Sequence, residues 1–413
     1  MQNAHCGKLT RRRVVAGAAA ATALLGSPAV VRAETKALKV ALLLPQSGYF
    51  AAAGQSCYRG AVIAPKVLAD YGYHVTLSYY DFESNVAKAR IQAERAIGDG
   101  AQCLVGAFES GATLAIAQVC EQRKVPLVVN IAAAPPITEQ GYKYLVRNFD
   151  TGGQLLTNGL RLIKDLIAAT KVDLTTAVFL HANDTFGMSM RHAMDKLFPV
   201  SHMPFKIAES ISFDPQAQDL SVEVTKVRAL NPDIVLVITH AADAIKLIRG
   251  MVMQRFEPKA IISPGSPGLY DEEFFDALGP LADFSIYTLP WANPKAQMTQ
   301  ALEAAFKPAH PKYRFAVDSF NVGFTFEALL IAADSFKRAG TANGSQLMAA
   351  IRATDIADHV MIGGPIKFDD KGQNNNIRSA VVQNRNRTPV VVLPPNVATM
   401  TPVLPMPPWH GRT

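Results

Sequence analysis

The first residue whose type and position could do chemistry is a serine between two apolar segments. Ser110 stands in VGAFESGATLAIAQV, residues 105–119, after an apolar run that ends at Phe108 and before a helix-like segment from Ala112. A serine at such a strand-to-helix turn can be a nucleophile or a helix N-cap. It can also hold an anion, because free N–H groups at a helix start, together with a hydroxyl, bind a carboxylate.

The nucleophile interpretation has the least support in the sequence. A nucleophile elbow reads G-x-S-x-G at a strained turn, but the glycine that precedes Ser110 is displaced to Gly106. No histidine or aspartate can be assigned as a partner, although His181 and His240 lie near predicted strand ends. We therefore predict no enzyme and no catalytic residue. The cap and the anion holder remain compatible with each other.

Other chemical motifs are missing from the sequence. There is no G-x-G-x-x-G after the first predicted strand and no G-x-x-x-x-G-K-[ST], so nucleotide binding is not indicated. The nine histidines are scattered, without an H-E-x-x-H or Cys/His cluster. Two adjacent aspartates in FDDKGQNNN (368–376) lack the alternate spacing of a calcium loop. The sequence predicts neither a metal site nor a cofactor.

The N-terminus has the features of an export signal. Three arginines, Arg11–Arg13, precede an alanine-rich apolar run at 16–25, and VRA ending at Ala33 resembles a cleavage site. The paired arginines resemble a twin-arginine signal, with an ordinary secretory signal as the alternative. The run is too short to be a stable membrane span. We expect a signal peptide over 1–33 and an exported, soluble protein in the periplasm.

Removal of this leader changes the charge of the chain. The full sequence has 41 Lys and Arg against 34 Asp and Glu, a net charge of +7. Residues 1–33 hold five of the bases and no acid, so 36 bases remain against 34 acids. No argument for a nucleic-acid partner survives.

The cysteine count of the exported part is odd. Cys6 leaves with the leader, and Cys57, Cys103 and Cys120 remain. In an oxidising compartment there are two alternatives, namely one disulfide plus a free thiol, or three buried thiols.

The elements that must position these residues alternate along the chain. Short apolar runs, typical of strands buried on both faces of a parallel sheet, are separated by amphipathic helices. About ten strands are too many for one compact layer, so we predict an α/β protein with two doubly wound lobes. The strands are expected at 38–45, 74–81, 102–108, 126–132, 175–182, 206–213, 232–240, 259–268, 284–291 and, as two segments, 379–395; the longest helix is expected at 318–338.

In open α/β sheets, ligands bind beyond the carboxyl ends of the strands. The residues there are mostly small, polar-neutral or aromatic, with almost no charge and no obvious acid/base pair. This composition suits binding better than catalysis. They are 47–49, 110–113, 131–134, 183–186, 240–241 and 263–266.

These residues carry a resemblance to the leucine/isoleucine/valine-binding protein family, the type I periplasmic receptors of ABC importers. It spans almost all of residues 36–395 and rests on the order and spacing of several segments. The resemblance implies two lobes joined by three hinge crossings that close on a small ligand. The segments are PQSGYFAAAGQSCYRGAVIA, VGAFESGATLAIAQV, VPLVVNIAAAPPITEQGYKYLVRNF, HANDTFGMSM, DIVLVITHAADAIKLIRGM and GPIKFDDKGQ.

The resemblance also implies domain limits. Lobe 1 would comprise 36–152 and about 290–375, and lobe 2 would comprise 153–289 and about 376–397. Residues 398–413 would form a tail.

Carried over by position, the ligand site lies between the lobes. Ser110 would hold the ligand carboxylate with its hydroxyl, and main-chain groups near Ala132 and Ala133 would complete that site. The other implied ligand-binding residues are the helix start at Ala112 and Thr113, the aromatic wall Phe186, and Tyr49, His240 and Gly265.

One position departs from the amino-acid binders of that family, which need an acid for the ligand's ammonium. The aligned position is Gly265, and an ammonium buried without a counter-charge would cost several kcal/mol. We therefore expect a hydrophobic or aromatic carboxylate without an α-amino group. Glu109 or Asp184 would restore amino-acid binding if the ammonium position of the family is displaced by a few residues from Gly265 and falls on one of them.

The resemblance also implies the partners. The expected protein is a monomeric substrate-binding protein that delivers a small carboxylate to an ABC permease in the inner membrane. Amino-acid binding and a ligand-sensing receptor of the same fold are the alternatives, and a secreted hydrolase would require Ser110 to be a nucleophile.

Overall fold

The computed structural model describes residues 37–412. The expected signal peptide, its cleavage site and Cys6 lie outside these residues. Cys57, Cys103 and Cys120 are all buried, and none of the three forms a disulfide. Of the two possibilities that the cysteine count left open, the three buried thiols are found.

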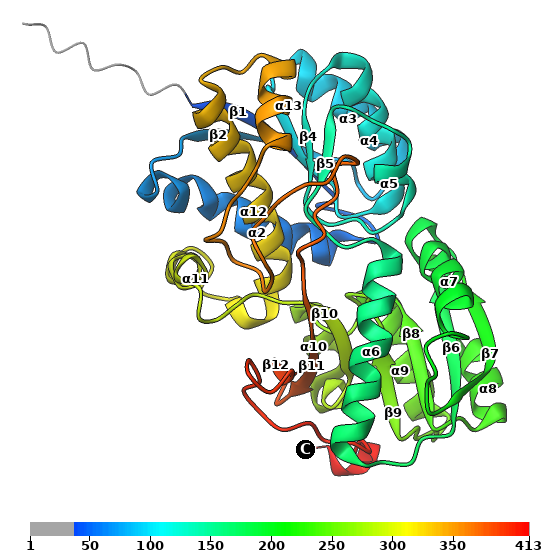
Figure 1. Ribbon diagram of the computed structural model, residues 1–413. Helices are drawn as coiled ribbons and strands as arrows, with labels where there is room; N and C mark the ends of the chain where they lie inside the picture. The colour runs from blue at the N-terminus through cyan, green and yellow to red at the C-terminus, as the bar shows by residue number, and fades with distance from the viewer. Residues whose placement is uncertain (1–36, 413) are drawn as a thin grey trace, which may run out of the picture. The chain divides into compact units, whose positions relative to one another are not determined.

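The first sheet is parallel and has the strand order β2-β1-β3-β4-β5 (Figure 1). Alternate residues of its strands face opposite layers. Leu42 and Val105 pack in the cluster that contains Val67 of α2 and Phe320 of α12, whereas Leu104 packs in the cluster with α3 and α4. The strands are β1 (Leu38–Leu44), β2 (Val75–Asp81), β3 (Cys103–Gly106), β4 (Leu127–Val129) and β5 (Leu145–Arg147).

Helices cover both faces of this sheet, as a doubly wound layer requires. Three of them, α11 to α13, come from the later part of the chain and rejoin the first lobe (Figure 1). The helices of this lobe are α2 (Ala51–Asp70), α3 (Val86–Gly98), α4 (Ser110–Arg123), α5 (Pro136–Glu139), α11 (Gln297–Ala309), α12 (Phe315–Ala339) and α13 (Gly344–Arg352).

The second sheet has the order β12-β11-β10-β9-β8-β6-β7, with β11 and β12 antiparallel to their neighbours. The five strands from β6 to β10 are parallel and buried almost throughout, apart from the edge strand β7. The strands are β6 (Thr176–Ala182), β7 (Lys206–Phe213), β8 (Ile234–Ile238), β9 (Ala260–Ser263), β10 (Ile286–Pro290), β11 (Ser379–Arg385) and β12 (Thr388–Leu393). The helices are α6 (Gly152–Thr170), α7 (Thr185–Leu197), α8 (Ser221–Leu230), α9 (Ala241–Met253), α10 (Glu272–Leu278), η1 (Gly279–Ala282) and η2 (Trp409–Gly411).

The chain passes between the two sheets three times. It leaves the first sheet after β5, returns after β10 and crosses again before β11 (Figure 1). The expected two-lobed α/β fold is therefore confirmed. The three crossings lie near residues 152, 290 and 375, where the domain boundaries were expected. The exact boundaries stay predictions.

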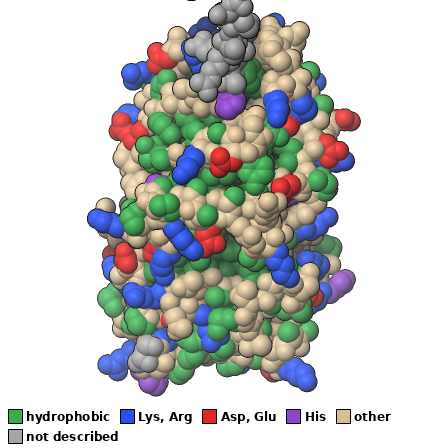
Figure 2. All heavy atoms as spheres, turned by 90° about the vertical axis from the view of Figure 1, so that its left-hand side faces the viewer, with side chains coloured by type: hydrophobic (Ala, Val, Ile, Leu, Met, Phe, Trp, Pro, Cys, Tyr) green, Lys and Arg blue, Asp and Glu red, His purple; other side chains and the backbone are tan. Residues whose placement is uncertain are grey.

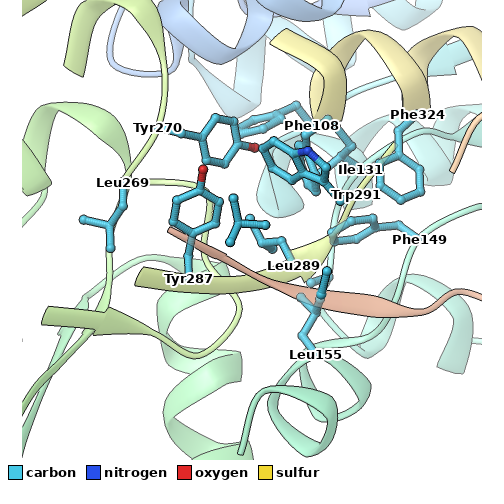
Figure 3. Packing of buried hydrophobic residues seen from close by; sticks show 14 of the residues in the cluster. Phe108, Ile131, Phe149, Leu155, Leu269, Tyr270, Tyr287, Leu289, Trp291 and Phe324 are labelled. Carbon is cyan, nitrogen blue, oxygen red and sulfur yellow. The ribbon is translucent and has the colours of Figure 1, made fainter. Parts of the chain in front are cut away.

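Helix α12 is apolar and 25 residues long, enough to cross a membrane by length and composition. It is instead a core helix, because 94% of its most apolar window is buried in the fold. Its Phe320 and Phe324 rings meet Phe149 with centroids 5.8 and 5.0 Å away. Figure 3 shows Phe149 and Phe324 in the buried cluster that includes Tyr270, Tyr287 and Trp291.

Charges of both signs lie on the face of the molecule shown in Figure 2. Lys and Arg side chains are interspersed there with Asp and Glu side chains. A mixed face of this kind has no single-sign field of the type that attracts a nucleic acid.

Candidate ligand-binding cleft

A cavity lies where strand ends of the two sheets meet. The free volume between its walls is about 390 Å³, including the part open to solvent. Residues after β1, β3, β4 and β5 line it from the first lobe, and residues after β6, β8 and β9 line it from the second. The lining residues are Phe50, Phe108, Glu109, Ser110, Ile131, Ala132, Ala133, Phe149, Asp184, Phe186, His240, Gly265, Pro267 and Phe320.

Five phenylalanine rings dominate this lining. Phe50 meets Phe108 edge-on with centroids 6.2 Å apart, and Phe149 meets Phe320 in the same way. Figure 3 shows Phe108 and Phe149 among the buried aromatic residues near Trp291. Phe186 completes the aromatic wall from the second lobe. Edge-to-face rings prefer these separations, so the cavity is suited to a flat apolar ligand.

Ser110 is 2% exposed and lies at the start of α4. Its Oγ accepts a hydrogen bond from the N–H of Ala134 at 3.4 Å. The serine hydroxyl can accept that bond and still donate its own proton. Ser110 is therefore placed to donate to a group in the cavity.

The N-cap of α4 is Glu109, which corrects the expectation that Ser110 caps this helix. Glu109 has an extended backbone, and its carboxylate accepts from the N–H of Gly111 at 2.6 Å and from the N–H of Ala112. The carboxylate satisfies two of the orphan N–H groups at the helix start, where the helix dipole also favours a negative charge. Burial raises the pKa of Glu109, and these two hydrogen bonds oppose that rise.

The expected role of the helix-start donors also needs correction. Ala112 donates its N–H to Glu109, and Thr113 donates its N–H to the main-chain oxygen of the same residue at 2.9 Å. Neither Ala112 nor Thr113 is among the residues that line the cavity. Their donors are already occupied, so the free N–H groups must come from elsewhere.

The loop after β4 supplies such donors. Ala132 and Ala133 line the cavity and are 2% and 1% exposed. Within residues 37–412, the N–H groups of Ala132 and Ala133 donate to no protein acceptor. The carbonyl of Ala133 accepts from the N–H of Gly152 at 2.7 Å, which ties this loop to the start of α6.

Charged side chains reach the cavity from both lobes. Glu109 comes from the first lobe, and Asp184 and His240 come from the second. His240 Nε2 and Asp184 Oδ2 are 3.0 Å apart, and Asp184 also accepts from the N–H of Gly187 at 2.6 Å as the N-cap of α7. The sequence predicted almost no charge at this edge, and the cavity is more charged than that because the two acids that cap α4 and α7 line it.

The pKa of His240 is raised and the pKa of Asp184 is lowered, each chiefly by contact with the other. Burial alone would lower the pKa of His240, but the hydrogen bond and the charge of Asp184 outweigh it and raise that pKa. Burial alone would raise the pKa of Asp184, but His240 and backbone N–H donors hold it below its ordinary value. Both shifts favour the charged form of the group concerned, the imidazolium of His240 and the carboxylate of Asp184.

Tyr49 and Gly265 complete the expected set. Gly265 lines the cavity and has φ +132°, so no acid side chain is present at that position. Tyr49 lines an adjoining hollow instead of the cavity, and its hydroxyl donates to Asp243 in α9. The neighbouring Phe50 takes the place in the lining that we expected of Tyr49.

Four of the five phenylalanines were not predicted as site residues. Phe50 directly follows the expected Tyr49, Phe108 lies two positions before Ser110 at the end of a predicted strand, and Phe149 ends the VRNF segment, so their positions near strand ends were a usable signal. Phe320 lies on α12, about 200 residues after Ser110 in the chain, and only the long-range packing brings it to the cavity.

The arrangement supports binding better than catalysis. Ser110 and His240 line the same cavity, but the His240 Nε2 is paired with Asp184, and no hydrogen bond joins it to Ser110 among residues 37–412. In the same part of the chain, no group of three His, Cys, Asp or Glu is arranged to hold a metal ion. The cavity offers hydrogen-bond donors, phenylalanine rings and the carboxylates of Glu109 and Asp184, which cap α4 and α7.

Known proteins are similar to this chain in sequence and in fold. The periplasmic binding protein family matches residues 37–387. The leucine-, isoleucine-, valine-, threonine- and alanine-binding protein of Pseudomonas aeruginosa is 23% identical over 352 residues, which cover 84% of this chain and 89% of that protein.

Two solved structures show the same fold with different ligands. An ABC-transporter solute-binding protein of R. palustris in complex with benzoate superimposes with a TM-score of 0.72 at 22% identity, covering 86% of this chain and 96% of that one. A branched-chain amino acid transporter substrate-binding protein of Streptococcus pneumoniae in complex with isoleucine has a TM-score of 0.73 at 17% identity, covering 86% and 98%. With these matches, the two-lobed fold and the cleft, the chain belongs to the leucine/isoleucine/valine-binding family of type I periplasmic binding proteins.

Proposed function

We propose that this chain is the exported solute-binding component of an ABC importer and that it captures a small aromatic carboxylate between its lobes. Membership of the periplasmic binding protein family supports the binding and transport role. The arginine-rich leader supports export to the periplasm. The protein then acts as a monomer that carries its ligand to a permease in the inner membrane.

The observation that carries the ligand class is that five phenylalanines line the same cavity as two hydrogen-bond donors that have no protein acceptor among residues 37–412. Five phenylalanines line the cavity that also holds the Ser110 hydroxyl and the Ala133 N–H. A carboxylate accepts two such donors, and hydrogen bonds to a charged group are stronger than those between neutral groups. Burying an aromatic ring against apolar walls adds roughly 2–3 kcal/mol. A benzoate- or cinnamate-type acid matches both parts of this lining.

An amino acid is the second candidate, and one observation favours it. Glu109 and Asp184 line the same cavity, where either could face an ammonium. Each carboxylate already has partners, namely two N–H groups for Glu109 and the imidazole plus an N–H group for Asp184. Those partners reduce the need of either acid for a further cation. The aromatic acid therefore remains the better-supported ligand.

A thermal-shift screen tests this proposal. A ligand that binds the native state raises the melting temperature by mass action. Benzoate- and cinnamate-type acids should raise it, and leucine, isoleucine and valine should raise it less at equal concentration. A rise with aliphatic amino acids and none with aromatic acids would replace the first candidate by the second. A ligand-sensing receptor of the same fold would also bind, and a permease gene beside this one would separate it from an importer component.

A further inference from the structure

Arg147 is a fully buried guanidinium that forms no salt bridge with any of residues 37–412. It ends β5, and its exposed fraction is 0%. Among residues 37–412, its guanidinium forms no ion pair, whereas the buried Arg59 pairs with Asp318. An unpaired buried charge is costly, so its retention calls for a physical reason.

Four neutral oxygens surround this guanidinium. Its Nη1 donates to the carbonyls of Ala132 at 3.1 Å and Ala134 at 2.8 Å. Its Nη2 donates to Thr138 Oγ1 and its Nε to Gln373 Oε1, both at 2.7 Å. Two of these acceptors belong to the loop that lines the cleft, so the charge lies directly behind the cleft wall.

The peptide group between Ala132 and Ala133 transmits the positive charge of Arg147 to the cleft. In a trans peptide, the C=O and N–H bonds point in opposite directions. Because the Ala132 carbonyl faces Arg147, the N–H of Ala133 points away from the guanidinium, and Ala133 lines the cavity. Hydrogen bonds in series polarise one another. The guanidinium therefore strengthens the positive end of the peptide dipole beside Ser110.

We propose that Arg147 is the counter-charge of an anionic ligand and acts on it through the peptide between Ala132 and Ala133, without contact. The role rests on the carboxylate site of the proposed function. It makes Arg147 a positioning residue that favours acids over neutral molecules of the same shape. Burial lowers the pKa of Arg147 to about 9, although the charges of Asp150, Glu139 and Asp369, none of which forms a salt bridge with it, oppose that fall.

The test compares an acid with its neutral isostere. Calorimetric affinities for benzoate and benzamide give an acid-to-amide ratio, and a purely structural role for Arg147 would lower both affinities alike. Arg147→Gln should reduce the wild-type ratio by about tenfold or more. Arg352→Gln is the matched control, because Arg352 also donates to main-chain carbonyls in the first lobe, those of Tyr142, Lys143, Leu145 and Asp370. It should leave the ratio unchanged.

A second pair of variants keeps the arginine in place. Thr138→Asp gives the guanidinium its own carboxylate, and Thr138→Asn is the neutral control of the same size. We expect the acid-to-amide ratio of Thr138→Asp to fall about tenfold below that of Thr138→Asn. Equal ratios in these two variants, or an unchanged ratio in Arg147→Gln, would overturn the inference. A wild-type protein that binds neither compound would count against the proposed function instead.

Discussion

The hydroxyl of Tyr49, in the loop after β1, donates a hydrogen bond to the carboxylate of Asp243 in α9. This bond joins a side chain of the first lobe to a side chain of the second. Asp243 also accepts from the N–H of His240 at 3.1 Å, and its other oxygen has no partner among residues 37–412. Burial and the charge of Asp243 raise the pKa of Tyr49, so the phenol stays protonated as the donor. Because the family resemblance implies lobes that close on a ligand, we expect this bond to favour the closed arrangement.

Tyr49→Phe should therefore weaken ligand binding. A hydrogen bond to a charged group contributes about 1.5–3 kcal/mol, so the affinity should fall by about tenfold or more. Calorimetric titration measures this change. Tyr144→Phe is the control, because its hydroxyl bonds to Ser345 within the first lobe. An equal loss in both variants would show that the Tyr49 bond has no special role in closure.

Ser110→Ala should weaken binding of the carboxylate by roughly 1–3 kcal/mol, the cost of losing a hydrogen bond to a charged group. The affinity for the best acid from the thermal-shift screen, measured before and after the substitution, gives this value. An unchanged affinity would mean that the Ser110 hydroxyl serves only the loop, through its bond to Ala134.

The Asp184–His240 pair should make stability depend on pH. The pKa of Asp184 is lowered from 3.8, so its contribution is present above that value and is lost as the pH falls through the folded pKa. The pKa of His240 is raised from 6.5, so its contribution is present below that value and is lost as the pH rises through the folded pKa. The pair should stabilise the fold most between these two values.

Asp184→Asn tests this dependence, because asparagine keeps the N-cap of α7 and removes the charge. Glu109 and Asp243, which also act on the pKa of His240, remain in the variant. The free energy of unfolding, from urea titrations, should differ more between wild type and variant near pH 5.5 than near pH 8.5. A difference that does not change with pH would contradict the ion pair.

Gly265→Ala should destabilise the protein. The residue has φ +132°, and an added Cβ would lie 3.0 Å from the Cβ of Leu155. A strained backbone of this kind costs roughly 1–3 kcal/mol of unfolding free energy. Gly98→Ala is the control, since nothing lies within 4 Å of its added Cβ. A Gly265→Ala variant as stable as the wild type would contradict the strain expected from this positive φ.

Much of the fold follows from local pattern in the sequence. The strand at 206–213 was predicted with the bounds it has, and the longest helix, expected at 318–338, is α12 at Phe315–Ala339. β5 was missed because it has only three residues and ends in the buried Arg147. An arginine inside a short apolar run gives no periodic signal, and its burial depends on acceptors from other segments.

The site was less predictable than the fold. Ser110, Ala132, Ala133, Phe186, His240 and Gly265 all line one cavity, because strand ends of parallel sheets meet at one edge. Their role as ligand contacts stays a prediction. The capping by Glu109 was missed because the sequence offers two adjacent capping residues, and only the backbone geometry decides between them. Phe320 reaches the cavity through tertiary packing that no local pattern encodes.

Calorimetric titration with 3-phenylpropionate and with phenylalanine tests the central claim most directly. The two compounds share the ring and the carboxylate and differ only in the α-amino group. If the cleft takes an aromatic carboxylate, 3-phenylpropionate should bind more tightly than phenylalanine. Glu109 and Asp184 are already hydrogen-bonded as helix caps, so the ammonium of phenylalanine would have no dedicated partner. Tight binding of phenylalanine or leucine with no binding of 3-phenylpropionate would contradict the account and make this an amino-acid binder.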